Sequence, residues 1–277
     1  MKILFVIPHY FGTGPQGYGS TNDSQRAKRL EALRAVIVAL HQHSGAQQCM
    51  LTDPAQAPRQ ANQAISNDID IVLCTTGNNH LLDELDLAKG RYERFVVDIP
   101  NPLYLGYSAY AVFKQAYGHY DWYCYLEDDI VIYDPLFFSK LQSFYLSAAN
   151  NSSLLQPNRY EVSPDSCSKM YIDSHMAPGF DVFRLPNHRQ RIDINFLGTP
   201  LRMVPAENPH SGCFFLTEEH LGALLEKPWY GNDAGCFAGP LESAATFPIT
   251  TVFHVFKPSQ ECAGFLEVHH FHRQCAI

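Results

Sequence analysis

The sequence is poor in charged residues and contains no long apolar run. Asp, Glu, Lys and Arg make up 17% of the 277 residues, and the formal net charge is −8. A chain with this balance offers no basic field for a nucleic acid backbone, so nucleic acid is not an expected partner. Its apolar stretches are much shorter than the ~20 residues that cross a membrane, so no transmembrane segment is expected. Hydrophobic residues still amount to 46%, which is enough for a sizeable core.

The cysteines and the first ten residues bear on the compartment. The eight cysteines form no C-x-x-C pair, and several lie inside apolar runs. The opening segment, MKILFVIPHY, has a five-residue apolar run before Pro8, which is short for an export signal and suits a first β-strand. We therefore expect reduced thiols and a cytoplasmic protein.

Short apolar runs alternate with amphipathic stretches in the first half of the chain. Leu33, Ile37 and Leu40 recur at helical spacing, and Asn22 with Gln25 suits a capping box at the start of that helix. This order predicts an α/β fold with a mostly parallel, Rossmann-like central sheet flanked by helices, and ligands at the carboxyl ends of its strands. Strands are expected within residues 1–10, 69–76, 94–100 and 122–129, and helices within 24–43 and 102–118.

The second half has a different composition. From about residue 150 to 191 it is rich in Asn, Pro, Arg and Ser, which predicts loops and an irregular region packed on the sheet. Regular patterns return with a strand at 212–217, a helix at 217–227 and late strands at 251–257 and 265–271. We expect one domain over 1–277, with a first half of 1–135 and a second half of 136–277.

One glycine motif matches a known fingerprint but lacks its context. Gly12, Gly14 and Gly17 fit G-x-G-x-x-G, which in dinucleotide-binding folds joins a strand directly to a helix. Here four residues separate the first strand from Gly12, and the helix begins only near Asp23. A surface or ligand-covering loop is the preferred interpretation.

Three consecutive acids, Glu127, Asp128 and Asp129, follow the apolar run WYCYL and precede Ile130-Val-Ile. A strand end points into the ligand crevice, and adjacent carboxylates repel one another unless a cation or hydrogen-bond donors are present. Carboxylate oxygens suit Mn²⁺ or Mg²⁺, which complete their shells with phosphate and water. An ordinary turn after an edge strand is the alternative, although the buried runs on both sides disfavour it.

This segment, with the helix at 102–118 before it and Asp134-Pro135 after it, resembles the D-x-D region of nucleotide-sugar glycosyltransferases of the GT-A fold. The resemblance implies that Asp129 binds Mn²⁺ or Mg²⁺ and that Glu127 and Asp128 lie near the ribose of a UDP- or GDP-sugar. The first acid is Glu where that family usually has Asp. By the same resemblance the nucleobase would lie against Pro8 and Tyr10, the half 1–135 would bind the nucleotide sugar, and the half 136–277 would bind a carbohydrate or other hydroxyl acceptor.

The resemblance also suggests catalytic residues further along the chain. The strand Pro209-His-Ser-Gly-Cys-Phe-Phe-Leu-Thr217 is similar to the one under the sugar in that family, although a buried strand explains the same residues. Glu242, with Asp233 as second choice, lies where the family carries an acidic residue that takes the proton of the acceptor hydroxyl. Pro240 and Glu242 equally suit an ordinary helix start.

Late histidines and basic residues offer further ligands. His254 and Lys257 are similar to a His and Lys-Pro pattern of some GT-A enzymes, where His completes the metal shell and Lys meets the diphosphate. His269, His270 and His272 are another choice, because His270 and His272 would share one face of a strand. Simple solvent-exposed or core histidines remain an open alternative. Four arginines are candidates for a diphosphate or an anionic acceptor: Arg184, Arg189, Arg191 and Arg202.

Other functions fit parts of the same pattern. A sugar-phosphate nucleotidyltransferase would use a related sheet, but residues 9–24 lack the Arg or Lys expected in its Gly-rich loop. A metal-dependent hydrolase could combine the late histidines with the acidic triplet. A carbohydrate-binding protein without catalysis is possible if no acidic base is present. The interpretation that accounts for most of these features is a metal-dependent glycosyltransferase.

Overall fold

The computed structural model describes most of the chain, namely residues 1–12, 22–51, 55–148, 152–163, 167–173, 191–231 and 239–271. The helices are α1 (Arg26–Ala39), α2 (Ser108–Ala116), α3 (Phe137–Ser147), α4 (Glu218–Leu225) and α5 (Pro240–Val252). No described helix is long and apolar enough to cross a membrane.

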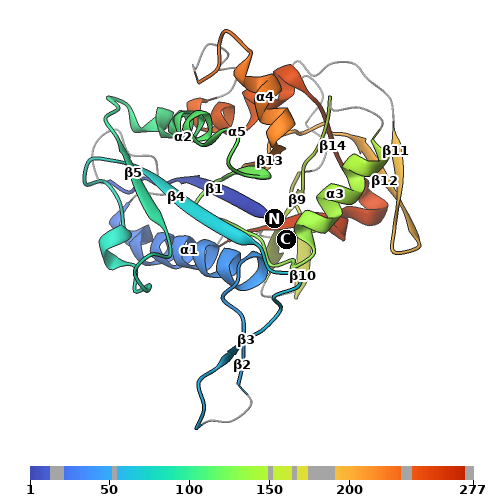
Figure 1. The fold of residues 1–277 in the computed structure, drawn as a ribbon. Coiled ribbons are helices and arrows are strands. Elements are labelled where there is room, and N and C mark those ends of the chain that lie inside the picture. The colour runs from blue at the N-terminus through green and yellow to red at the C-terminus, as the bar shows by residue number, and fades with distance from the viewer. Residues whose placement is uncertain are drawn as a thin grey trace.

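The central sheet has five strands in the order β13-β6-β1-β4-β5 (Figure 1). They are β1 (Lys2–Pro8), β4 (Asp68–Thr76), β5 (Glu93–Val97), β6 (Trp122–Leu126) and β13 (Cys213–Thr217). β1 pairs in parallel with β4 and β6, β4 pairs in parallel with β5, and β13 joins β6 antiparallel. The expectation of a mostly parallel sheet flanked by helices is therefore confirmed.

Alternation along β1 divides the core between the two faces of this sheet. Ile3, Phe5 and Ile7 pack in one buried cluster, which includes side chains of α1, whereas Leu4 and Val6 pack in the other, with α2, α4 and α5. Figure 1 shows α1 on one side of the sheet and these three helices on the opposite side. Complete burial of an apolar side chain of this size contributes roughly 1.5–3 kcal/mol, so β1 anchors both layers.

The second half is more regular than its composition suggests. Two further four-stranded sheets have the orders β10-β9-β15-β7 and β11-β12-β14-β8. Their strands are β7 (Ile130–Val131), β8 (Ser153–Leu155), β9 (Asn158–Ser163), β10 (Ser168–Tyr171), β11 (Ile192–Phe196), β12 (Thr199–Pro205), β14 (His254–Pro258) and β15 (Glu267–His270). Loops were expected over 158–163 and 168–171, which was wrong: both segments are strands without a continuous apolar run, β9 with three buried residues and β10 with half-buried and exposed residues in alternation.

Local boundaries also differ from the sequence-based expectation. Asn22 makes no side-chain capping hydrogen bond, because a short 3-10 turn, Asp23–Gln25, precedes α1. The segment expected as one helix over 102–118 begins with a 3-10 turn, Pro102–Tyr107, before α2. The late strand begins at His254 rather than at residue 251, since α5 continues to Val252.

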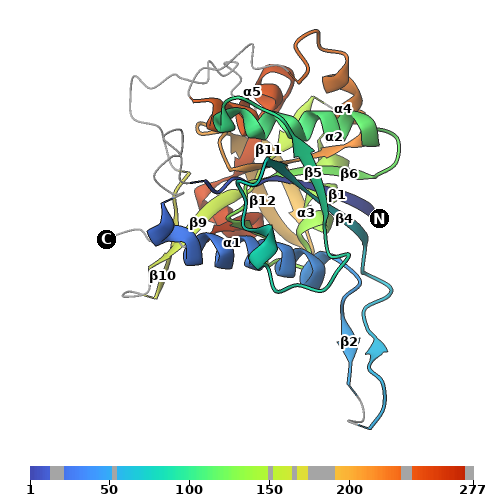
Figure 2. The ribbon, with the colours of Figure 1, turned by 90° about the vertical axis from the view of Figure 1, so that its left-hand side faces the viewer.

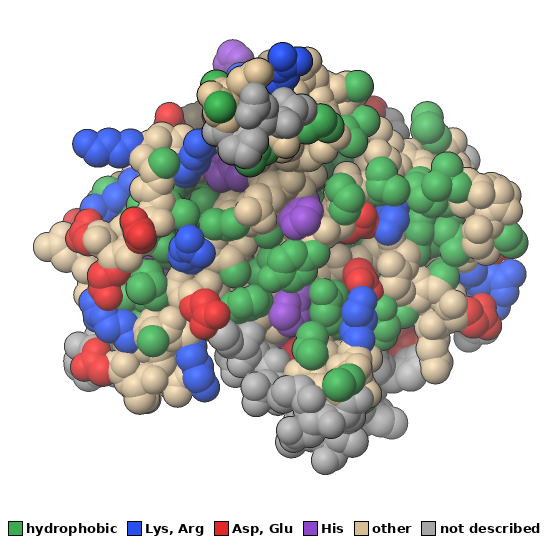
Figure 3. Space-filling view, turned by 90° about the horizontal axis from the view of Figure 1, so that it is seen from below, with side chains coloured by type: hydrophobic (Ala, Val, Ile, Leu, Met, Phe, Trp, Pro, Cys, Tyr) green, Lys and Arg blue, Asp and Glu red, His purple; other side chains and the backbone are tan. Residues whose placement is uncertain are grey.

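A thin two-stranded arm, β2 (Cys49–Met50) and β3 (Arg59–Gln60), projects away from the sheets in both ribbon views (Figures 1 and 2). On the face seen in Figure 3, Lys and Arg side chains are interspersed with Asp and Glu. The acidic triplet lies far along the chain from this arm, between β6 of the central sheet and β7 of the sheet β10-β9-β15-β7.

Candidate functional site

A pocket of about 250 Å³ lies at the carboxyl ends of β1 and β6. These strands are adjacent and parallel, with Val6 opposite Tyr125, so the residues that follow each strand come together at one edge of the sheet. The pocket is lined by Pro8, Tyr10, Arg29, Pro102, Leu105, Gly106, Tyr125, Glu127, Asp128, Asp129, Arg159, His210, Leu241 and His270. The structure thus brings together six residues that the sequence singled out: Pro8, Tyr10, Glu127, Asp128, Asp129 and His270.

The acidic triplet forms the turn between β6 of the central sheet and β7 of the next sheet. The main-chain N–H of Glu127 donates to the carbonyl of Gly212 (2.8 Å), and that of Ile130 donates to the carbonyl of Glu127 (3.1 Å). Gly212 has φ +63°, and a Cβ there would lie 2.7 Å from a carboxylate oxygen of Glu127. Only glycine allows the start of β13 to approach the acids this closely.

Asp128 is held by two basic side chains. Arg29, from α1, places one guanidinium nitrogen 2.5 and 2.6 Å from its two carboxylate oxygens. His9 lies 2.5 Å from Asp128 through Nδ1, and its Nε2 accepts the main-chain N–H of Leu81 (3.1 Å). Because Nε2 is an acceptor, the ring carries its proton on Nδ1 and donates it to Asp128. Asp128 is therefore fixed in position from both sides.

Asp129 lies between the same arginine and a histidine from the end of the chain. Arg29 reaches it at 3.2 Å, and Nε2 of His270 lies 3.7 Å from its carboxylate. The main-chain N–H of Phe271 also donates to the carbonyl of Asp129 (2.8 Å). The cause is strand pairing, because β15 lies beside β7 with His270 opposite Ile130.

Glu161 orients the ring of His270. Nδ1 of His270 lies 2.9 Å from the Glu161 carboxylate, and both side chains are mostly buried. Burial alone would lower the pKa of His270, but its contact with the charge of Asp129, aided by Glu161, raises it. A carboxylate on one ring nitrogen, with the other nitrogen turned toward a second acid, is compatible with the arrangement found around metal-bound histidines.

Glu127 lies on the other side of the pocket, opposite His210. Nε2 of His210 is 3.9 Å from the carboxylate, and Nδ1 of His210 is 2.9 Å from the hydroxyl of Thr246. Burial and the charge of Asp129 raise the pKa of Glu127 to about 7, whereas burial and the charge of Arg159 lower that of His210 to about 3. Near neutral pH this pair is a neutral imidazole beside a carboxyl group able to give or take a proton.

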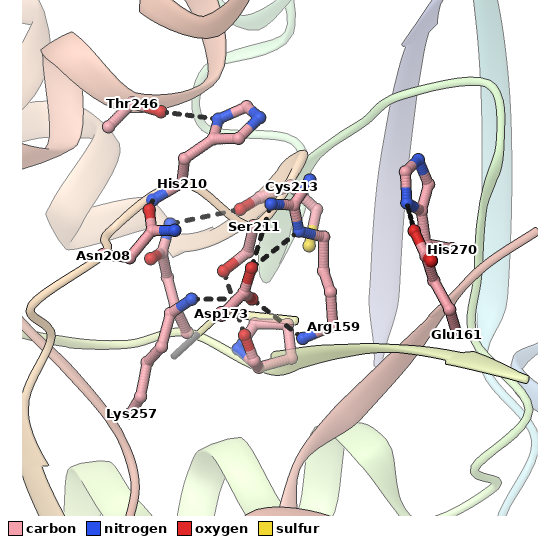
Figure 4. A network of polar contacts seen from close by, with 12 residues as sticks. Arg159, Glu161, Asp173, Asn208, His210, Ser211, Cys213, Thr246, Lys257 and His270 are labelled. Atoms are coloured by element: carbon pink, nitrogen blue, oxygen red, sulfur yellow. Dashed lines mark hydrogen bonds and ion pairs between the residues drawn. The ribbon is translucent and has the colours of Figure 1, made fainter. Parts of the chain in front are cut away.

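Behind Glu127 lies a buried group of charges, Arg159, Asp173 and Lys257 (Figure 4). Nε of Arg159 donates to one Asp173 oxygen (2.9 Å), and Lys257 donates to the other (2.8 Å). Burial would raise the pKa of Asp173, but the two cations outweigh it and hold that pKa below its usual range. Arg159 lines the pocket, and Lys257 does not.

Other residues proposed from the sequence lie away from this pocket or outside the described residues. His254 begins β14 beside Ser153 of β8, and it is not among the residues lining the pocket. Glu242 is the third residue of α5; its side chain lies outside the described part, although its neighbour Leu241 lines the pocket. Asp233 and His272 also lie outside the described residues, as do Arg184 and Arg189. Arg202 is exposed and pairs with Asp193.

Four residues of the site were not anticipated: His9, Arg29, Glu161 and Arg159. His9 directly follows Pro8, so a search of the residues after each strand would have found it. Arg29 and Arg159 reach the pocket, and Glu161 reaches His270, through pairing or packing between distant segments, for which the sequence gives no local signal.

The donor atoms present fit a divalent ion at Asp129. Within the described ranges, no group of three or more His, Cys, Asp or Glu side chains converges as a preformed metal site. Asp129 and His270 nevertheless offer a carboxylate and an imidazole nitrogen 3.7 Å apart, too far for a hydrogen bond and short enough for two ligands about 2.0–2.2 Å from one ion. Mn²⁺ and Mg²⁺ commonly take one or two protein ligands and complete their shells with phosphate and water.

The chain was also compared with known proteins. Its sequence matches no protein-family model and no curated protein.

Proposed function

We propose that the protein is a divalent-metal-dependent glycosyltransferase of the GT-A type, which moves a sugar from a nucleoside diphosphate to an acceptor hydroxyl. The observation that carries this proposal is the junction at Asp129. There the carboxyl ends of two parallel strands meet, three carboxylates line one pocket, and His270 is oriented by Glu161 toward Asp129.

In this proposal Asp129 and His270 hold Mn²⁺ or Mg²⁺. The bound ion supplies positive charge to the diphosphate that leaves the sugar. Glu161 keeps the proton of His270 on Nδ1, so that Nε2 is the nitrogen offered to the ion. Arg29, which contacts both acids, would remain hydrogen-bonded to Asp128 with an ion at Asp129.

The remaining pocket residues bind and orient the donor. Pro8 and Tyr10 line the pocket at the end of β1 and would contact the nucleobase. Asp128 cannot rotate freely, because His9 and Arg29 hold both of its oxygens, and it would present a fixed acceptor to the ribose. Glu127 would lie at the ribose or at metal-bound water.

The proton of the acceptor hydroxyl needs a base on the side of the second half. Glu242 or Asp233 are our candidates for this role. Support for Glu242 is positional, because α5 begins at Pro240 and Leu241 already lines the pocket. Lys257, which the resemblance places at the diphosphate, is buried against Asp173 instead. It would act on the pocket only indirectly, by sharing Asp173 with Arg159.

A metal-dependent hydrolase is the second candidate. It is favoured by the pairing of Glu127, whose pKa is about 7, with neutral His210. Such a pair could activate water beside an ion at Asp129. A hydrolase of this kind has no need for a nucleoside diphosphate, which makes nucleotide binding the discriminating measurement.

The test is thermal unfolding of the wild type with a panel of nucleoside diphosphates, each with and without Mn²⁺. We expect stabilisation by UDP or GDP that requires Mn²⁺, and its loss in Asp129→Asn. Asp193→Asn is the matched control, because Asp193 is an exposed, arginine-paired aspartate away from the pocket. If no nucleotide stabilises the wild type in a metal-dependent manner, the proposal is wrong. Stabilisation that is unchanged in Asp129→Asn would refute only the metal assignment.

A further inference from the structure

Arg159 presents a preformed cationic edge to the pocket. Asp173 accepts Nε and Nη2 of its guanidinium, both at 2.9 Å, and also its main-chain N–H at 2.9 Å. The side chain is 12% exposed, its position is fixed by its contacts with Asp173 (Figure 4), and Arg159 is among the residues that line the pocket. A guanidinium has five N–H groups, and Asp173 takes two of them.

The charge of Arg159 is only partly balanced by its anchor. Asp173 is shared with Lys257, so this buried pair of cations has one carboxylate between them. The other charged groups facing Arg159 across the pocket are Glu127, whose carboxylate attracts it, and His270, which repels it when protonated. Among the described side chains, no second hydrogen-bond acceptor of the Arg159 guanidinium is present.

We propose that Arg159 is the recognition group for an anionic substituent, a carboxylate or a phosphate, carried by the transferred sugar or the acceptor. The inference deepens the proposed function and rests on it for the identity of the ligand. A fork of guanidinium N–H groups matches the two oxygens of such a substituent, and its hydrogen bonds are stronger than those to a neutral hydroxyl. An uncharged sugar would add no negative charge to a site where Arg159 and Lys257 share the single carboxylate of Asp173.

The diphosphate of the donor is a second source of the same chemistry. Asp129 and His270 already provide for it through the ion, at the end of the pocket held by Arg29. Arg159 lies on β9, in the second half of the chain, where the acceptor is expected. We therefore assign Arg159 to the substituent and use UDP with Mn²⁺ as a separate arm of the test.

The experiment measures the binding of small probes by NMR titration, without nucleotide. Glucuronate and glucose 6-phosphate carry the two kinds of anion, and glucose is the uncharged match. Each is titrated into the wild type, Arg159→Gln, Arg159→Lys and Arg202→Gln. Arg202 is the control because its side chain also pairs with an aspartate, Asp193, but lies on the exposed surface away from the pocket.

We expect the acidic probes to bind the wild type at least tenfold more tightly than glucose, and Arg159→Gln to abolish that preference. Arg159→Lys keeps a cation beside Asp173 and should fold, yet it should lose most of the preference because the planar fork is gone. Arg202→Gln should behave like the wild type. In ¹⁵N-arginine-labelled wild type, the Arg159 side-chain signals should shift with the acidic probes and not with glucose, whatever the stability of the variants.

Two results would overturn the assignment. One is equal binding of acidic and neutral probes to the wild type, or a preference that survives in Arg159→Gln. The other is a loss of UDP binding with Mn²⁺ in Arg159→Gln as large as the loss of acidic-probe binding, since Arg159 would then serve the diphosphate. Failure of UDP and GDP to bind the wild type would refute the glycosyltransferase proposal, while the preference for acidic probes would stand or fall independently.

Discussion

Glu161 accepts the Nδ1 hydrogen of His270 at 2.9 Å, and this contact turns the other ring nitrogen toward Asp129. Glu161→Gln keeps the size of the side chain and removes its charge. We expect the affinity for Mn²⁺ to fall roughly 10–100-fold, because a neutral amide makes His270 a weaker ligand. Isothermal titration with Mn²⁺ measures this effect.

The control for that variant is Glu267→Gln. Glu267 lies on the same strand as His270 and pairs across the sheet with Lys169 and Tyr171, away from the pocket. Its affinity for Mn²⁺ should match the wild type. An affinity of Glu161→Gln within twofold of the wild type would show that His270 does not bind the ion through this arrangement.

Arg29 is expected to stabilise the fold by balancing the negative charges of Asp128 and Asp129. Arg29→Gln leaves Asp128 and Asp129 adjacent with one fewer counter-charge, and loss of one partner from a largely buried pair destabilises by roughly 3 kcal/mol. The unfolding temperature should drop by several degrees and partly recover on adding Mn²⁺. Arg26→Gln, one turn away on the same helix and exposed against Glu84, should change the unfolding temperature little.

Scanning calorimetry with and without Mn²⁺ distinguishes the two arginines. Equal, small shifts for both variants would mean that Arg29 contributes no more than a surface pair. A loss in Arg29→Gln that Mn²⁺ leaves unchanged would mean that the ion does not bind at Asp129.

Alanine substitutions at Gly212 and Gly198 distinguish the cost of backbone strain from the cost of a steric clash. Both have positive φ, +63° and +84°, so Ala at either position is disfavoured by about 1 kcal/mol. At Gly198 nothing lies within 4 Å of the new Cβ, whereas at Gly212 it would meet Glu127 at 2.7 Å. Gly212→Ala should therefore be clearly more destabilised than Gly198→Ala in urea unfolding, and only Gly212→Ala should lose ligand binding. Equal stabilities would indicate that the turn at Glu127 can move.

The raised pKa of Glu127 predicts how the free energy of unfolding changes with pH. The carboxyl group is more easily protonated in the folded protein, with a pKa of about 7 against an ordinary value of 4.5. Below pH 4.5 its contribution to the free energy of unfolding is fully present, and it is lost as pH rises toward 7, because the folded state must then keep a partly buried charge beside Asp129. The loss is on the order of 2–3 kcal/mol.

Glu127→Gln provides the measurement. Its free energy of unfolding relative to the wild type should rise between pH 4.5 and pH 8, because only the wild type loses stability through this group. Denaturant titrations at several pH values in that range test the sign. A difference that is flat with pH would contradict a raised pKa at Glu127.

The fold was predictable where short, uninterrupted apolar runs mark buried parallel strands, as in β1, β4 and β6. Segments such as β9 and β10 were missed because strands with one side in water contain too few apolar residues to stand out. The high content of Asn, Pro and Ser around these two strands was taken to indicate irregular structure. Pairing with a strand that is distant in sequence can stabilise such a segment, and this pairing cannot be inferred from the composition of the segment.

The site was predictable in part for the same reason. Asp128 and Asp129 follow a buried strand, so their place at the sheet edge could be inferred. The choice among late histidines could not be inferred, because it depends on β15 pairing with β7 rather than on spacing. His254 had the better resemblance, yet the strand register brings His270 to Asp129. Arg29 and Glu161 likewise depend on contacts between distant segments.

Pairing of β15 between β7 and β9 also sets the order in which the pocket can form. During synthesis the acids of the triplet leave the ribosome about 140 residues before His270, whose strand is the last of the described elements. Until that strand inserts, both of its neighbours expose an unpaired edge, and Asp129 has no histidine beside it. Nascent chains without β15 would therefore lack the contact of Asp129 with His270 and be prone to associate through these edges, so the speed of this insertion bears directly on the yield of folded protein.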